Sequence, residues 1–188
     1  MSLHTNEKNS IQMRKNTVRT VPLQKVYLGL DLGSVSLNTV LLNQHHEVVE
    51  EFYDYVHGRP FNILMDRLMD ILSRYYPKDI TGISITGTGG KLATELIGGV
   101  FVNEILAQAT SVGRLFPDAR TVIEIGGEDS KFIMLEKDTL SGHNRLVDFE
   151  MNSICAAGTG SFLDQQARRI GVDIVTEFGE MALRSVDP

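Results

Sequence analysis

Two segments of this 188-residue chain repeat one design, in which an apolar strand ends near an acid, a glycine-containing turn follows and a second apolar strand leads away. The first segment is 26–42 and carries Asp31, and the second is 121–133 and carries Glu124. A single hairpin with glycine in its turn is ordinary β structure. Two such hairpins, each with an acid beside the turn, predict a pair of phosphate-binding turns that face one nucleotide.

The residue types around these turns fit that chemistry. Backbone N–H groups bond phosphate oxygens most readily where little or no side chain blocks their approach. Asp31 and Glu124 are expected to hold a hydrated magnesium ion, acting through its waters. Glu128 or Asp129 is expected to orient or deprotonate an attacking water, with Lys131 balancing the charge, and the alternative interpretation is a solvated charged turn. The expected phosphate donors are Gly33, Ser34, Gly126 and Gly127.

The single cysteine of the chain, Cys155, lies within segment 152–164, before a helix predicted to run towards Arg169. A thiol beside the unpaired N–H groups and positive dipole end of a helix is biased towards thiolate, the form that binds metal. The alternative is a small buried hydrophobic side chain, but glycines nearby would let the backbone approach an anion and favour a functional role. The residues expected to do so are Gly158, Thr159 and Gly160.

Three segments resemble the first phosphate, second phosphate and cluster-cysteine motifs of the activators of 2-hydroxyacyl-CoA dehydratases and benzoyl-CoA reductases, the BadF/BadG/BcrA/BcrD-type ATPases. These segments are 31–34, 124–131 and 152–164. Segments 86–90 and 104–109 are similar to further parts of the family, so the resemblance runs from Val26 to the end. The activators belong to the superfamily of acetate and sugar kinases, heat-shock chaperones and actin. The resemblance therefore implies an α/β, actin-like or ribonuclease H-like ATPase fold.

The resemblance also implies an activity. It implies a homodimer that shares one [4Fe-4S] cluster and couples ATP hydrolysis to single-electron transfer, from the cluster to a dehydratase or related reductase. The expected cofactors are then ATP or ADP, Mg²⁺ and the cluster, with ferredoxin or flavodoxin as electron donor. Cys155 is expected as a cluster ligand and Glu104 as part of the nucleotide site. The alternative is a nucleotide-gated sensor, or a small-molecule kinase of the same superfamily, without a redox cluster.

This chain departs from the family pattern at several positions. Val35 and Asn38 stand where family members often carry Thr and Lys, and Glu128 stands where they often carry an amide. These departures predict a changed nucleotide affinity and hydrolysis rate. A [4Fe-4S] cluster is held by four thiolates. Members of the family have two cluster cysteines per subunit, whereas this chain has only Cys155.

The length predicts an incomplete second domain. A chain of 188 residues suits one compact domain and a part of another, whereas the superfamily fold needs two. We therefore expect an N-terminal fragment, in which 1–25 is a disordered leader, 26–119 the first ATPase domain and 120–188 the truncated start of the second. Such a fragment is expected to be inactive, to bind nucleotide weakly and to hold no intact cluster.

Composition narrows the expected partners. The net charge of −6 argues against a nucleic-acid partner. The sequence has no apolar run that approaches the roughly 20 residues of a membrane helix. One cysteine allows no intrachain disulfide, so nothing indicates secretion and a cytoplasmic protein is expected.

Hydrophobic periodicity predicts the elements. Met65 and Met69 lie at helical spacing and are predicted to be core residues. The predicted strands are 26–31, 36–42, 47–55, 80–86, 121–126, 131–136 and 145–151, and the predicted helices are 60–76, 91–97, 103–115, the one that runs towards Arg169, and 175–184.

Overall fold

A computed structural model describes residues 25–139, 142, 144–152 and 158–186 of the chain. Its N-terminal part contains a five-stranded sheet in the order β3-β2-β1-β4-β5. In this sheet β1 is antiparallel to β2 and parallel to β4, and β2 and β3 are antiparallel. The strands are β1 (Val26–Leu32), β2 (Ser36–Leu42), β3 (Val48–Tyr55), β4 (Ile80–Thr86) and β5 (Val100–Phe101).

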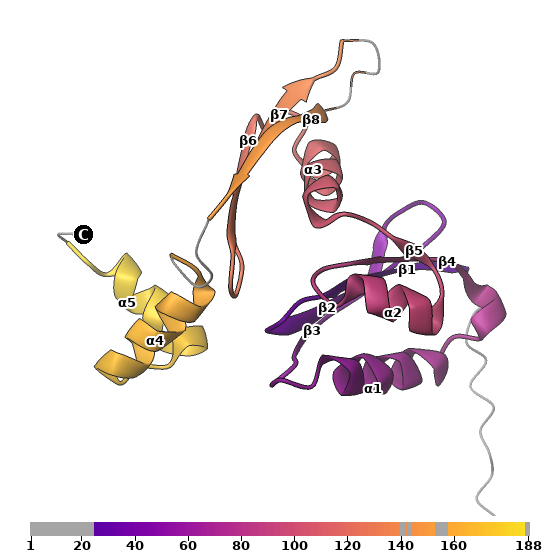
Figure 1. Cartoon of the computed structure of the whole chain (residues 1–188), viewed down its shortest axis with the longest axis horizontal. Coiled ribbons are helices and arrows are strands. Elements are labelled where there is room, and N and C mark those ends of the chain that lie inside the picture. The colour runs from indigo at the N-terminus through magenta and orange to yellow at the C-terminus, as the bar shows by residue number, and fades with distance from the viewer. Residues whose placement is uncertain (1–24, 140–141, 143, 153–157, 187–188) are drawn as a thin grey trace, which may run out of the picture.

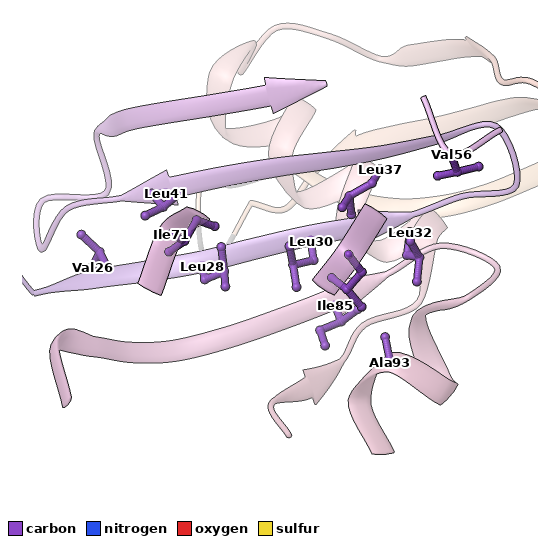
Figure 2. Close-up of a cluster of buried hydrophobic side chains, with 11 residues drawn as sticks. Val26, Leu28, Leu30, Leu32, Leu37, Leu41, Val56, Ile71, Ile85 and Ala93 are labelled. Carbon is purple, nitrogen blue, oxygen red and sulfur yellow. The ribbon is translucent and has the colours of Figure 1, made fainter. Parts of the chain in front are cut away.

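The main hydrophobic core lies on one face of this sheet, where α1 (Pro60–Leu72) and α2 (Gly90–Ile97) cover it (Figure 1). Every second residue of β1 is buried, because successive side chains of a strand point to opposite faces. Pro60 occupies the first turn of α1, where its missing N–H group leaves no intrahelical bond unmade. Figure 2 shows the buried side chains, which include Val26, Leu28, Leu30, Leu32, Leu37, Leu41, Ile71, Ile85 and Ala93.

The alternation in β1 also places Asp31 on the face of the sheet that points away from α1 and α2. Leu30 and Leu32, on either side of Asp31, are both buried in the core. A carboxylate at this position can therefore reach the space on the opposite face without disturbing the core.

The second sheet is antiparallel, in the order β6-β7-β8, and α3 (Glu104–Leu115) packs against it (Figure 1). Its strands are β6 (Thr121–Ile125), β7 (Ser130–Lys137) and β8 (Asn144–Met151). Ile105 and Ala109 of α3 form a second core with Ile133 and Leu135 of β7. The helix begins at an N-cap residue, Asn103, whose side chain accepts hydrogen bonds from two backbone N–H groups of the first turn.

The C-terminal part of the described chain is helical. It consists of α4 (Gly160–Ile170), a single π-helical turn over Ile174–Phe178 and α5 (Gly179–Leu183). Gly171 ends α4 in the left-handed conformation, with φ at 76°. None of the described helices is both long and apolar enough to cross a membrane.

The strand and helix order predicted up to α3 is confirmed, but three details were wrong. Met65 and Met69 are 56% and 65% exposed, because α1 buries the face that carries Leu64 and Ile71. The helix ends at Leu72, four residues earlier than predicted, and a 3₁₀ turn over Pro77–Asp79 follows. The two-residue strand β5 was not predicted, since so short a run has no readable alternation.

Candidate functional site

The two predicted turns are closed in the same way. In the β1–β2 turn the N–H group of Gly33 donates to the carbonyl oxygen of Ser36, with an N···O distance of 2.9 Å. In the β6–β7 turn the N–H group of Gly126 donates to the carbonyl oxygen of Asp129, also at 2.9 Å. Both turns are therefore hairpins with two residues at the tip.

This closure changes which backbone groups can bind a phosphate. Gly33 and Gly126, two of the four expected donors, use their N–H groups inside their own turns. Ser34 and Gly127, the next residues along each turn, have N–H groups without a partner in the part of the chain that the structure describes. The N–H groups of Val35 and Glu128 also have no partner among the described residues, so the structure leaves at least two possible donors at the tip of each turn.

The tips of the two turns touch. A Cβ atom added to Gly127 would overlap Cγ2 of Val35, so only glycine allows this approach. Val35 is itself fixed by its carbonyl oxygen, which accepts a hydrogen bond of 2.9 Å from the N–H group of Val56. Ser34, Val35, Gly126 and Gly127 line a cleft of about 740 Å³, together with Tyr53 and the first turn of α4.

Behind the second turn, three carboxylates surround the ammonium group of Lys131. Its Nζ atom lies 2.8 Å from Oε1 of Glu104, 2.7 Å from Oε2 of Glu124 and 2.9 Å from Oδ1 of Asp129. The Lys131 side chain is only 1% exposed. Burial by itself lowers the pKa of Lys131, but the hydrogen bonds to Glu104, Glu124 and Asp129 outweigh burial and raise the pKa above its ordinary value.

Asp31 lies apart from this cluster, on the wall of a cavity of about 940 Å³ that Asn38, Thr86 and part of α3 also line. Asn38 donates a long hydrogen bond of 3.4 Å to Oδ2 of Asp31. Burial, followed by the negative charge of Glu104, raises the pKa of Asp31 above its ordinary value. In the described part of the chain Asp31 makes no ion pair. It is therefore a carboxylate that a cation would stabilise.

The predicted site residues are thus divided between two cavities. Ser34, Gly126 and Gly127 line the cleft between the turns, whereas Asp31 lines the larger cavity. Glu128 is exposed at the tip of the second turn. The contact between Val35 and Gly127 joins the two turns where phosphates were expected to bind.

Oxygen donors suited to magnesium are present in both places. One carboxylate oxygen from each of Glu104, Glu124 and Asp129 lies within 4.8 Å of the others, which is a spacing that a metal ion could bridge. The ammonium of Lys131 already contacts all three. Asp31, without such a cation, fits a hydrated magnesium ion better.

The first turn of α4 binds the second hairpin through its backbone. The N–H groups of Gly160 and Ser161 donate to the carbonyl oxygens of Gly126 and Gly127, at 2.8 and 3.0 Å, and the Ser161 hydroxyl also donates to Gly127. The helix N-terminus, expected to face an anion, therefore satisfies two of its N–H groups with peptide carbonyls. The carbonyl oxygen of Gly158 accepts a bond from the hydroxyl of Ser130.

Thr159 and Cys155 complete the expected cysteine segment. The Thr159 side chain is fully buried, and its hydroxyl has no hydrogen-bond partner among the residues that the structure describes. Cys155 lies outside the described residues, so its expected role as a cluster ligand stays a prediction.

Sequence reasoning missed three residues of this region. Val35 was noted only as a departure, yet it makes the contact between the turns. Ser161 was not assigned a role; it lies one residue inside α4, and its hydroxyl donates to Gly127 of the second hairpin, which the local sequence does not indicate. Thr86 pairs in register with Asp31 and has a buried hydroxyl without a described partner; its position before a glycine-rich segment was the available signal.

Known proteins of similar sequence and structure include ATPases and dehydratase activators. Residues 28–186 match the BadF/BadG/BcrA/BcrD ATPase family. The 2-hydroxyisocaproyl-CoA dehydratase activator of Clostridioides difficile is 32% identical over 164 residues, which are 84% of this chain and 57% of the relative. The structure of the activator from Clostridium difficile with bound ADPNP has a TM-score of 0.71 at 30% identity, covering 85% of this chain and 57% of that one.

A second solved structure is the (R)-2-hydroxyglutaryl-CoA dehydratase component A of Acidaminococcus fermentans, with a TM-score of 0.73 at 29% identity over 85% of this chain and 59% of that chain. These likenesses confirm the α/β, actin-like ATPase fold that the sequence predicted. The chain spans 57% of the length of the 2-hydroxyisocaproyl-CoA dehydratase activator and 58% of that of the (R)-2-hydroxyglutaryl-CoA dehydratase activating ATPase of Acidaminococcus fermentans. On the match over 28–186, the chain belongs to the BadF/BadG/BcrA/BcrD ATPase family.

Proposed function

We propose that this chain forms the nucleotide-binding part of an ATP-dependent activase, which couples ATP hydrolysis to single-electron transfer towards a CoA-ester dehydratase or reductase. Family membership and the similarity to dehydratase activators, one with bound ADPNP, support the proposal. The observation that carries it is the pair of matching turns, in which Ser34 and Gly127 keep unpartnered N–H groups and line one cleft.

The nucleotide phosphates bind, in this proposal, where the two turns meet. Ser34 and Gly127 donate their N–H groups to phosphate oxygens, as small residues in tight turns can. Asp31 and Glu124 contact a hydrated magnesium ion through its waters. Glu124 can do this while paired with Lys131, because only its Oε2 atom bonds the ammonium and Oε1 is left beside Gly126.

Glu128 is the residue that we assign to orienting the attacking water. It is exposed at the tip of the second turn, next to Gly127, and its carboxylate has no partner among the described residues. Asp129, the other candidate, is held by Lys131 at 2.9 Å and is less free to bind water. The rate of hydrolysis then depends on Glu128 more strongly than the affinity for nucleotide does.

We propose that Cys155 is one of the four thiolate ligands of a [4Fe-4S] cluster shared in a homodimer. The Cys155 residues of the two subunits would supply two of the ligands. The other two would come from residues other than Cys155, one for each subunit. Such a cluster would supply the single electron for the dehydratase, with a ferredoxin or flavodoxin as the proposed electron donor. The chain's own contribution is α4, whose first turn is hydrogen-bonded to the nucleotide-binding turn through Gly160 and Ser161.

A calorimetric titration with Mg·ADP, at a protein concentration suited to a weak site, tests the nucleotide proposal. We expect Asp31→Ala to weaken binding at least tenfold, or about 1.4 kcal/mol, because it removes a carboxylate that is proposed to hold the magnesium ion and makes no ion pair in the described chain. The control is Glu136→Ala, which removes an exposed carboxylate of β7 outside the site and should bind Mg·ADP as the parent does. Equal affinity of the Asp31→Ala variant and the parent would contradict the magnesium role.

A further inference from the structure

The Lys131 ammonium is bound in the way that a metal ion usually is. Its three protons match three acceptor oxygens, one from each of Glu104, Glu124 and Asp129, at 2.7 to 2.9 Å. The acceptors come from three different places: the first turn of α3, the strand β6 and the residue before β7. The same three oxygens have the mutual spacing of a metal-binding group, all within 4.8 Å of one another.

We infer that Lys131 is a resident cation of the site, which fills the position that a divalent ion would otherwise take between Glu104, Glu124 and Asp129. Three carboxylates this close repel one another strongly unless a positive charge lies among them. The Lys131 side chain is 1% exposed and the three carboxylates are 26–38% exposed, so water screens their repulsion only in part. The inference concerns the chain without nucleotide and does not rest on the function proposed above.

The ammonium also makes Lys131 a positioning residue. Glu104 belongs to α3, whereas Glu124 and Asp129 belong to the second hairpin, and Lys131 holds all three in one arrangement. A covalently attached cation cannot exchange with the solvent, so the carboxylates stay oriented whatever the metal concentration. Asp31, which makes no described ion pair, and the Oε1 atom of Glu124 are then left to meet an exchangeable magnesium ion through its waters.

A gain of metal binding tests this assignment. Lys131→Met keeps an unbranched side chain of similar length and removes the charge. Mn²⁺ is the probe, because it takes carboxylate oxygens as Mg²⁺ does and its free form is counted by electron paramagnetic resonance. Without nucleotide, we expect Lys131→Met to bind one equivalent of Mn²⁺ at least tenfold more tightly than the parent chain does.

Two further variants locate the gained site. The matched control is Lys137→Met, which removes the same charge from the same strand at its exposed end and should bind Mn²⁺ as the parent does. The double variant Lys131→Met, Glu104→Gln should lose the gained site, because one of its three carboxylates becomes an amide. A gained site that survives Glu104→Gln lies elsewhere and contradicts the inference.

The metal-binding test still applies if Lys131→Met does not fold by itself. If Lys131→Met is unfolded or less stable without metal, Mn²⁺ should restore its circular dichroism and raise its melting temperature, since an ion that binds only the folded state stabilises it. The inference is overturned if folded Lys131→Met gains no Mn²⁺, or if the variant stays unfolded at millimolar Mn²⁺. It is also overturned if the parent chain binds Mn²⁺ as tightly as Lys131→Met and loses that binding on Glu104→Gln.

Discussion

The contact between Val35 and Gly127 sets how closely the two turns approach, and a single methyl group tests it. In Gly127→Ala the added Cβ would overlap Cγ2 of Val35 and lie 3.0 Å from its Cβ. The φ angle of Gly127 is one that alanine can adopt, so the effect is steric. Overpacking of this kind costs about 1–3 kcal/mol, and the β-branched Val35 cannot rotate freely away. We expect a loss of about 2 kcal/mol, or roughly 4–8 °C in Tm.

Adding Val35→Ala to Gly127→Ala tests whether the loss of stability comes from this contact or from a general effect of alanine at position 127. Alone, Val35→Ala removes two half-buried methyl groups and should cost about 1 kcal/mol. Combined with Gly127→Ala it removes the overlap with Cγ2 but leaves a tight Cβ–Cβ contact of 3.0 Å, so the double variant should lie within about 1.5 kcal/mol of the parent, a coupling of about 1.5 kcal/mol. Urea unfolding of the four proteins, followed by circular dichroism, measures this at unchanged m-value. Additive effects, or a neutral Gly127→Ala, would refute the contact.

Two further predictions concern Asp31 and Ser161. Folding raises the pKa of Asp31 above its ordinary 3.8, so the contribution of Asp31 to stability is complete below pH 3.8 and is lost as the pH rises through the raised pKa. Asp31→Asn should therefore resist urea better than the parent at pH 7, and this difference in stability should close near pH 4. A difference that does not change with pH would contradict the burial argument. Ser161→Ala removes the hydroxyl bond to Gly127 and should cost about 1 kcal/mol, seen as faster amide hydrogen exchange in the first turn of α4 with α1 unchanged; equal exchange at α4 would show that the bond does not hold the helix.

Much of the fold could be predicted from local pattern. The alternation of β1 and the apolar face of α1 follow from side-chain periods of 2 and 3.6 residues, which short-range geometry imposes. The prediction of core residues failed where more than one face of a helix carries apolar side chains. Met65 and Met69 have the spacing of core residues, but α1 has only one face against the sheet, and Leu64 and Ile71 occupy it.

The candidate site could be predicted only in its residue types. Asp31, Glu124 and the two turns were recognisable because acids and small residues cluster near strand ends. Which N–H groups are free was not predictable, because Gly33 and Gly126 are consumed by the closure of each hairpin. Residue letters do not reveal that closure.

The family, the strand–turn–strand repeat and the chemistry available at each turn can be read from local sequence, because they depend on residues close together in the chain. Which of these residues meet depends on how the whole chain packs. Glu104 and Lys131 are 27 positions apart, and the packing of α3 on β7 and β8 brings them to 2.8 Å. Such contacts between distant residues depend on all the surfaces that are buried on folding. The buried charge of Lys131 is tolerated because the same packing places its carboxylate partners beside it.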